Sequence, residues 1–147
     1  MPGSPESPES LEERRRRLVE EHGPWVGYNL DLGAAGYTID PGSAGWAELM
    51  IRQITQVVAD HAGALEGLRV LDLGSHEGGY SIALAQQGAI VTAVESRAQH
   101  IAKTRFAADA LGLHDRITVV EDDVRNIDLD RFGRFDVLLC LGILYHL

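Results

Sequence analysis

Two acidic residues and two glycines in the middle of the chain have the types and spacing of a nucleotide-binding site. Asp72 and Gly74 end an apolar run, Gly78 follows four residues later, and a second apolar run ends in Glu95. A carboxylate about 20 residues after such a glycine loop can accept hydrogen bonds from the two hydroxyls of a ribose. Glycines suit the loop because they adopt positive φ and carry no Cβ, so the backbone can lie against a ligand. These residues therefore predict a bound nucleoside.

The elements that must hold these residues are a strand, a helix and a second strand. Residues 68–73 form a run rich in leucine and valine, residues 80–88 can form a helix, and residues 90–95 form the next apolar run. A strand, a glycine loop, a helix and a strand in this order form one βαβ unit of a parallel sheet. The loop lacks the G-x-G-x-x-G spacing of dinucleotide enzymes, so an NAD-dependent oxidoreductase is disfavoured.

The loop resembles motif I of the class I S-adenosylmethionine-dependent methyltransferases, whose usual form is h-h-D-h-G-x-G-x-G. Asp72, Gly74 and Gly78 match this motif, and His76 stands where the middle glycine usually is. Residues 79–81, Gly-Tyr-Ser, fit the variant D-L-G-x-x-x-G-x-[FY]-S. The resemblance implies an α/β fold, the Rossmann-like methyltransferase sandwich, with S-adenosyl-L-methionine as the cofactor and its methionine amino group oriented by Asp72. A Rossmann-like unit that binds another nucleotide, or none, is the alternative.

Two later segments are similar to further methyltransferase motifs. Residues 117–127 resemble the third strand and the loop after it, in which Asp123 would bind the adenine amino group and Val124 would lie near the adenine ring. Residues 135–147 resemble the fourth strand and motif IV, where the backbone of Leu141 would approach the donor methyl. The resemblance therefore implies a cofactor site made of Asp72, Gly74, Ser75, Gly78, Glu95, Asp123, Val124 and Leu141.

The sequence Leu-Gly-Ile-Leu-Tyr-His at 141–146 points to a subgroup. It is similar to the L-G-[IV]-L-Y-H motif of enzymes like the tRNA wobble-uridine carboxymethyltransferases and of small-molecule methyltransferases. Tyr145 and His146 are the candidate catalytic residues near the donor methyl. Histidine titrates near neutrality, so His146 could take a proton from a hydroxyl acceptor. A hydrogen-bonded structural role for His146 and a cofactor contact for Tyr145 are the alternatives.

Three functions are compatible with these motifs. The first is methyl transfer to a small-molecule or sugar-like hydroxyl, the second is tRNA wobble-uridine modification, and the third is non-catalytic cofactor binding or protein interaction. A formal net charge of −9 disfavours a nucleic-acid partner, because affinity for phosphates depends on lysine and arginine. The four arginines at 14–17 lie between glutamates and are expected to form a solvated helix face.

Composition divides the chain into three parts. Residues 1–10, rich in proline, serine and glutamate, are expected to be a disordered tail. Residues 11–63 are expected to form an N-terminal helical and extended cap. Residues 64–147 are expected to be the N-terminal part of the S-adenosylmethionine-binding Rossmann-like domain.

The cap should contain a helix at 11–22, an extended or hairpin-like segment at 25–39 and a second helix at 43–62. A further helix is expected at 96–111, between the second and third strands. The apolar face of the helix at 43–62 should pack against the sheet, with cover over the cofactor mouth as the alternative, and it comprises Trp46, Leu49, Met50, Ile54, Val57, Val58 and His61.

The composition also bounds partners and location. Hydrophobic residues make up 45% of the chain, and no apolar run approaches the ~18 residues needed to span a bilayer, so a cytoplasmic protein without membrane association is expected. Cys140 is the sole cysteine and lies in an apolar run, where a buried thiol is typical. The six histidines show no ligand-like clustering, so no metal site is expected. A small-molecule acceptor is the expected partner, and the oligomeric state stays open.

The number of strands is smaller than in the family. The resemblance implies seven strands in the order 3-2-1-4-5-7-6, whereas this chain offers four. We therefore expect a chain truncated after the fourth strand, with residues 135–147 as a bare apolar edge. Such a fragment is expected to bind cofactor weakly or not at all and to be inactive. A minimal domain that pairs this edge with a second copy is the alternative.

Overall fold

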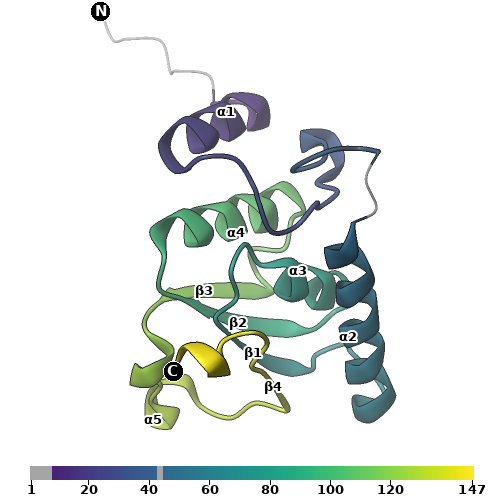
Figure 1. The fold of residues 1–147 in the computed structure, drawn as a ribbon. Coiled ribbons are helices and arrows are strands. Elements are labelled where there is room, and N and C mark those ends of the chain that lie inside the picture. Colours follow the sequence, from purple (N-terminus) through teal and green to yellow (C-terminus); the bar gives the residue numbers. More distant parts are fainter. Residues whose placement is uncertain (1–7, 43–44) are drawn as a thin grey trace, which may run out of the picture.

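The structure of the protein, a computed structural model, describes residues 8–42 and 45–147. Residues 1–7 of the expected tail, and Ser43 at the expected start of the second helix, lie outside the described residues. In the described part, four parallel strands form one sheet in the order β3-β2-β1-β4 (Figure 1). The strands are β1 Arg69–Leu73, β2 Ile90–Glu95, β3 Ile117–Glu121 and β4 Val137–Leu139. The predicted α/β fold and the order of its first four strands are confirmed.

The strand register places the predicted acids at one edge of the sheet. Asp72 of β1 pairs with Ala93 of β2, and Glu95 at the end of β2 pairs with Glu121 at the end of β3. Because the strands are parallel, the loops that follow them leave from the same edge. The strand order reverses between β1 and β4, and ligands of open α/β sheets bind in the crevice at such a point.

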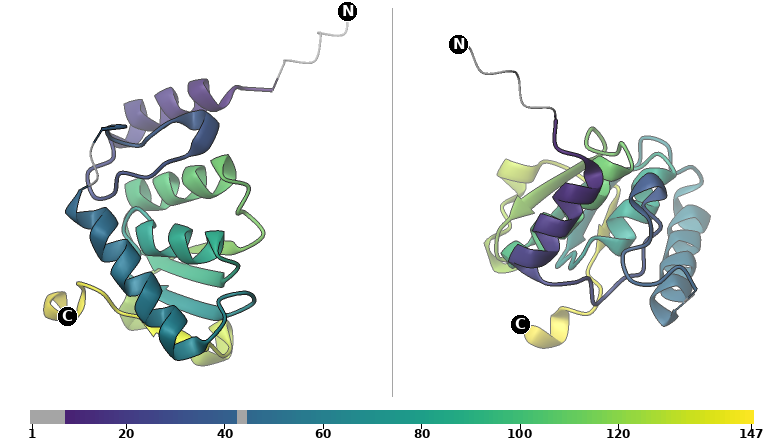
Figure 2. Two further views of the ribbon diagram at one scale, coloured as in Figure 1. Left: turned by 90° about the vertical axis from the view of Figure 1, so that its right-hand side faces the viewer. Right: turned by 90° about the horizontal axis from the view of Figure 1, so that it is seen from above.

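Two crossover helices cover one face of the sheet. α3, Gly79–Gln86, joins β1 to β2, and α4, Ala98–Ala110, joins β2 to β3; the two helices lie side by side (Figures 1 and 2). Burial of apolar area between these helices and the sheet drives folding of this part. The buried side chains there include Val70, Ile82, Leu84, Val91, Ala93, Phe106, Ala107 and Ile117.

The cap begins with α1, Leu11–His22, whose bounds match the predicted helix. Ser10 and Glu13 form a capping box, since each side chain accepts a hydrogen bond from the backbone N–H of the other residue. The helix ends at Gly23, which has a φ of +77°. Both ends are therefore encoded locally.

Two arginines of α1 bind protein groups. Arg14 forms a 2.9 Å ion pair with Asp109 on α4. Arg15 donates hydrogen bonds to the carbonyl oxygens of Ala35 and Tyr37. The prediction of a solvated helix face was wrong for these two side chains, because they fasten α1 to α4 and to the segment that follows α1.

The segment at 25–39 is hairpin-like, as predicted. Asp31 and Tyr37 form an isolated antiparallel bridge around a short 3-10 helix, η1, Gly33–Ala35. The Thr38 hydroxyl accepts a 2.8 Å hydrogen bond from the Leu30 N–H and donates to the carbonyl oxygen of residue 28. These bonds satisfy the backbone of a segment that has no sheet partner of its own.

The second cap helix, α2, spans Trp46–Ala62 and packs along α3 (Figure 2). Its buried face differs in part from the predicted one: Val58 is buried as predicted, but Leu49 and Val57 are about half exposed and Thr55 is buried instead. Apolar residues occupy more than one side of this helix. The spacing of apolar residues alone therefore does not predict which side contacts α3.

Short helical turns follow the last two strands. η2, Val124–Asn126, and α5, Leu129–Phe132, lie between β3 and β4, and η3, Leu144–His146, follows β4. β4 is an edge strand on which Leu138 is 57% exposed, and Cys140 beyond it is partly buried. In the ranges that the structure describes, no helix combines the length and apolar character needed to cross a membrane.

Candidate cofactor site

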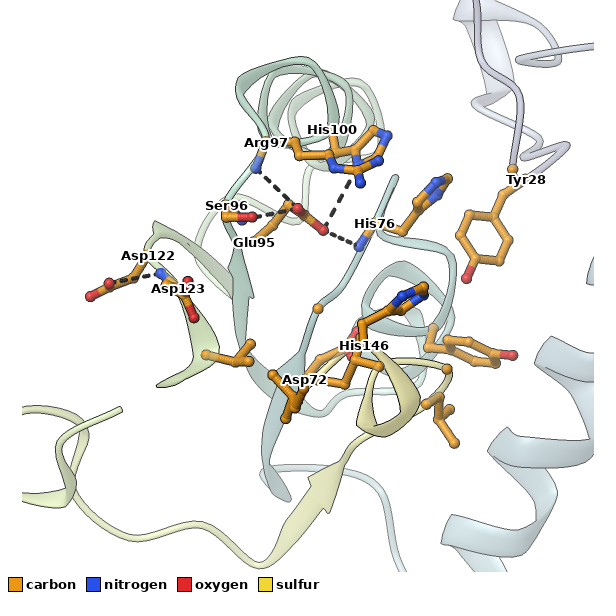
Figure 3. Close-up of a pocket in the computed structure, with 18 of the residues that line it drawn as sticks. Tyr28, Asp72, His76, Glu95, Ser96, Arg97, His100, Asp122, Asp123 and His146 are labelled. Carbon is orange, nitrogen blue, oxygen red and sulfur yellow. Dashed lines mark hydrogen bonds and ion pairs between the residues drawn. The ribbon is translucent and has the colours of Figure 1, made fainter. Parts of the chain in front are cut away.

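A cavity of about 710 Å³ lies at the carboxyl ends of the strands (Figure 3). Gly74 after β1 and Leu141 after β4 both line it, so it occupies the point where the strand order reverses. The cap also contributes Gly27 and Tyr28, and α2 contributes Met50. Its volume falls within the range of small-molecule sites.

The structure brings most of the predicted site residues to this cavity. The predicted residues that line it are Asp72, Gly74, Glu95, Asp123, Val124, Leu141 and His146. Three others do not belong to its lining: Ser75, Gly78 and Tyr145. Ser75 belongs to the loop after β1 and is buried, with no hydrogen-bond partner for its hydroxyl among the described residues.

Glu95 is held in place by backbone groups. Its Oε2 accepts a 2.9 Å hydrogen bond from the His76 N–H, and its Oε1 accepts bonds of 2.9 and 3.0 Å from the N–H groups of Ser96 and Arg97 (Figure 3). Two carboxylate oxygens offer about four lone-pair sites, so capacity remains for further donors. A fixed, buried carboxylate that lines the cavity suits a pair of ribose hydroxyls.

His76 adopts the backbone conformation that a glycine would supply. Its φ is +54°, and among the described residues it is the sole non-glycine residue with positive φ. The centroid of its imidazole ring lies 4.0 Å from the centroid of the His100 ring. The substitution for the usual glycine therefore preserves the turn and adds a ring beside the cavity.

The two motif glycines are required by protein neighbours. A Cβ on Gly74 would lie 2.4 Å from a methyl carbon of Ile143, and a Cβ on Gly78 would lie 2.6 Å from Thr104. Both glycines have positive φ, +67° and +83°. Gly74 thus lets the loop after β4 approach the loop after β1, and Gly78 lets α4 approach the start of α3.

Asp72 is a buried acid at the base of the cavity. It is 2% exposed, and the Ser81 hydroxyl donates a 2.7 Å hydrogen bond to its Oδ2. Burial raises the pKa of Asp72 to about 6; the Ser81 hydrogen bond opposes this shift and the charge of Glu95 adds to it. A cation placed beside Asp72 would favour its ionised form.

Asp123 follows β3, and its carboxylate accepts hydrogen bonds from Arg125. The Oδ1 atom accepts 2.9 Å hydrogen bonds from both the backbone N–H and the Nε of Arg125. These bonds, with the charge of the guanidinium, lower the pKa of Asp123 to about 2. Asp122 beside it also lines the cavity and accepts hydrogen bonds from Asn126 and Arg131. The predicted adenine-binding acid is therefore ionised and oriented.

The segment after β4 brings His146 to the cavity and leaves Tyr145 outside it. Tyr145 is 78% exposed and its ring contacts that of His146, with centroids 4.1 Å apart. Of the two candidate catalytic residues, His146 alone has a side chain at the site (Figure 3).

Several residues of the site were not found from the sequence. Tyr28 and Tyr80 line the cavity, with ring centroids 5.9 Å apart, and burial raises the pKa of Tyr28. His100 also lines it; its Nδ1 lies 3.7 Å from Glu95 Oε2 and has no hydrogen-bond partner in the described ranges. The aromatic residues among 25–39 are a signal that could have found Tyr28, whereas His100 lies in an ordinary helical pattern.

The charged groups that line the cavity suit a cationic nucleoside. Four carboxylates line the cavity against two arginines, and no lysine is among its lining residues. Such a lining suits a ligand with a sulfonium, an ammonium and hydroxyl groups, and it does not suit a pyrophosphate. No cluster of three or more histidine, cysteine or acidic residues among the described residues could hold a metal ion.

Comparison with known proteins identifies the family. A family model described as "Methyltransferase domain" matches residues 70–147, more than half of the chain. A ubiquinone biosynthesis O-methyltransferase of Haemophilus ducreyi is 38% identical over 87 residues, which cover 58% of this chain and 37% of the relative. The chain thus spans well under half the length of the curated relatives it matches.

Two solved structures are similar over nearly the whole chain. The N-terminal domain of EvdMO1 with SAH (S-adenosylhomocysteine) bound has a TM-score of 0.71 and 28% identity, and the match covers 95% of this chain and 57% of that one. The same domain in the presence of SAH and D-fucose has a TM-score of 0.69 and 29% identity, with 90% and 53% covered. With its sheet order, its cavity and these matches, the chain belongs to the family of S-adenosylmethionine-dependent methyltransferase domains.

Proposed function

We propose that the protein transfers the methyl group of S-adenosylmethionine to a hydroxyl group of a small, sugar-like or similar molecule. One observation carries this proposal: the acid Glu95, fixed by three backbone N–H groups, and His146 line the same cavity. The relatives named ubiquinone biosynthesis O-methyltransferase support an oxygen acceptor. The neighbour studied in the presence of D-fucose supports a sugar-like one.

Position and charge support the cofactor-binding roles that the motif resemblance implies. Glu95 accepts hydrogen bonds from the ribose hydroxyls, and Asp72 at the base of the cavity orients the methionine ammonium. Asp123 accepts a hydrogen bond from the adenine amino group, while Val124 and Leu141 provide apolar surface. Gly74, Ser75 and Gly78 build the loop that holds these groups at fixed distances.

The chain's own contribution to chemistry is orientation and one proton transfer. The bound cofactor supplies a methyl group that its sulfonium makes electrophilic. The cavity walls align the acceptor hydroxyl with that methyl and exclude water. His146 accepts the hydroxyl proton, a role that contributes typically 10²–10⁴-fold in rate. The tRNA-directed and non-catalytic alternatives have no specific observation in their favour.

A transfer assay with the full-length protein tests this proposal. The protein is incubated with S-adenosylmethionine and, in separate reactions, a deoxyhexose, a catechol-type phenol and a tRNA transcript. Formation of S-adenosylhomocysteine and a mass gain of one methyl on a hydroxyl of the sugar or the phenol are expected. Methylation of the tRNA alone, or of an amine, would contradict the proposal. The His146→Ala protein serves as the control for background transfer.

A further inference from the structure

Glu77 lies at the centre of a buried network that joins the cap to residues 74–78, the loop after β1, which we name the cofactor loop. Its side chain is fully buried, with 0% exposure. Its Oε1 accepts a 2.9 Å hydrogen bond from the N–H of Val26. Its Oε2 accepts hydrogen bonds of 2.8 and 3.2 Å from the N–H groups of Gly27 and Tyr28. The carboxylate thus binds three consecutive N–H groups of residues 24–28, a segment that we name the strap.

Lys103 of α4 completes this network. Its Nζ lies 3.2 Å from Glu77 Oε1 and donates a 2.6 Å hydrogen bond to the carbonyl oxygen of Pro24. Lys103 is 2% exposed, and a buried charge is tolerated when it is paired and hydrogen-bonded. Burial opposes ionisation of Glu77, but the strap N–H groups and the ammonium outweigh it and keep the pKa of Glu77 below its ordinary value.

The strap and the cofactor loop are in direct contact. At two positions of this contact only a glycine fits. A Cβ on Gly27 would lie 2.5 Å from the His76 ring, and a Cβ on Gly79 would lie 2.5 Å from the Tyr28 ring. The Tyr28 ring also packs edge-on against His76, with centroids 5.8 Å apart. The position of the strap is therefore set by the loop that carries Glu77.

This contact reaches the cavity at two points. Gly27 and Tyr28 of the strap line the cavity, although Glu77 does not; Figure 3 shows Tyr28 beside the cavity. His76, which precedes Glu77 in the same loop, donates a hydrogen bond from its backbone N–H to the Glu95 carboxylate. One short loop thus connects the strap wall of the cavity to the acid at the end of β2.

We propose that Glu77 is a positioning residue for the cofactor: by anchoring the strap it fixes one wall of the cavity and the loop that holds Glu95. The inference rests on the proposed function only for the identity of the ligand, S-adenosylmethionine. Glu77 acts through the strap and touches neither cofactor nor acceptor.

Isothermal titration with S-adenosylhomocysteine tests this role in the full-length protein. Glu77→Gln replaces one accepting oxygen by an amide nitrogen and leaves the buried Lys103 ammonium without a carboxylate partner, so the dissociation constant is expected to rise at least about tenfold. Asp109→Asn is the matched control, because its ion pair with Arg14 also joins the cap to α4 but lies away from the cavity. This control should bind S-adenosylhomocysteine like the wild type.

A second variant keeps the test decisive where Glu77→Gln fails to fold. Glu77→Met combined with Lys103→Met removes both charges at similar volume, so neither charge is left buried without its partner, while the three strap N–H groups lose their acceptor. It should fold, bind S-adenosylhomocysteine at least about tenfold more weakly, and show faster amide hydrogen exchange at residues 26–28 than the wild type.

The outcomes separate the two proposals. A folded Glu77 variant with released strap amides and wild-type affinity would overturn the positioning role. Equal losses of affinity for S-adenosylhomocysteine in Glu77→Gln and Asp109→Asn would overturn it as well. No binding by the wild-type full-length protein would instead overturn the proposed function.

Discussion

The main-chain N–H of His76 donates a 2.9 Å hydrogen bond to Oε2 of Glu95. His76 makes this bond from the left-handed region, at a φ of +54°. Asparagine, aspartate and histidine are the non-glycine residues found most often in this region. The conformation of the loop after β1 therefore sets the position of the acid at the end of β2.

Substitutions at His76 should separate backbone conformation from the imidazole. His76→Val should destabilise the protein by about 1–2 kcal/mol and weaken S-adenosylhomocysteine binding, because a β-branched residue is strained at this φ. His76→Asn, the matched control, should keep affinity close to the wild type. Thermal unfolding and titration calorimetry measure both effects. Wild-type stability and affinity in His76→Val would show that the left-handed turn is not required.

Cofactor affinity should depend on pH through Asp72. Since burial raises the pKa of Asp72 to about 6, the cofactor-free protein carries a neutral Asp72 below that pH. A methionine ammonium favours the carboxylate, so affinity for S-adenosylmethionine should fall by up to about tenfold per pH unit below pH 6 and level off above it. Titrations between pH 5 and pH 8 measure this. A flat profile would contradict the contact between Asp72 and the ammonium.

Because Asp72 is buried, its ionised form should lower the stability of the cofactor-free protein. A carboxyl whose folded pKa is raised contributes stability below its unfolded pKa of 3.8, and this contribution is lost as pH rises through about 6. Asp72→Asn should therefore stabilise the cofactor-free protein at pH 7 by up to about 3 kcal/mol while it weakens cofactor binding. A variant that is both less stable and weaker in binding would argue for a structural role.

His100 should make the protein sensitive to acid. Burial and the neighbouring His76 lower the pKa of His100 from its ordinary 6.5, Arg97 adds to this shift, and Glu95 and Glu77 oppose it. The unfolded chain therefore takes up this proton at a higher pH than the folded protein. Stability should fall as pH drops below 6.5 toward the lowered pKa, and His100→Gln should reduce that slope. Denaturant unfolding at pH 5.0 to 7.5 measures it, and identical slopes would refute the assignment.

His146 should affect turnover and leave cofactor binding intact. His146→Ala should lower kcat for a hydroxyl acceptor about 10²- to 10⁴-fold without a change in the dissociation constant of S-adenosylhomocysteine. Tyr145→Phe is the control, because Tyr145 is 78% exposed and outside the cavity lining. Steady-state kinetics with both variants decide the point. Full activity of His146→Ala would remove it as the base.

The βαβ unit could be predicted because its signals are local. The run that ends at Asp72, the glycines at 74 and 78 and the acid at 95 have the expected order, and all but Gly78 reach the cavity. The bounds of α1 could also be predicted, since Ser10 and Gly23 are cap signals close to the helix ends in sequence. Such features depend on residues a few positions apart.

The rest depends on contacts between distant parts of the chain. The buried face of α2 includes Thr55 and leaves Leu49 exposed, because packing against α3 selects among several apolar sides. Glu77 and Lys103 look like surface charges in their local sequence, yet they are buried against a segment about 50 and 79 residues away. No local pattern shows which charged residues will be satisfied in the interior.

The central claim is that S-adenosylmethionine binds at the carboxyl ends of β1 to β3 with its ribose held by Glu95. Calorimetric titration of the full-length protein with S-adenosylhomocysteine, repeated with Glu95→Ala, tests this claim most directly. We predict saturable binding by the wild type and a loss of affinity of at least about 10-fold in Glu95→Ala, since charge-assisted hydrogen bonds are removed. Absence of heat with the wild type, or equal affinity of the two proteins, would contradict it.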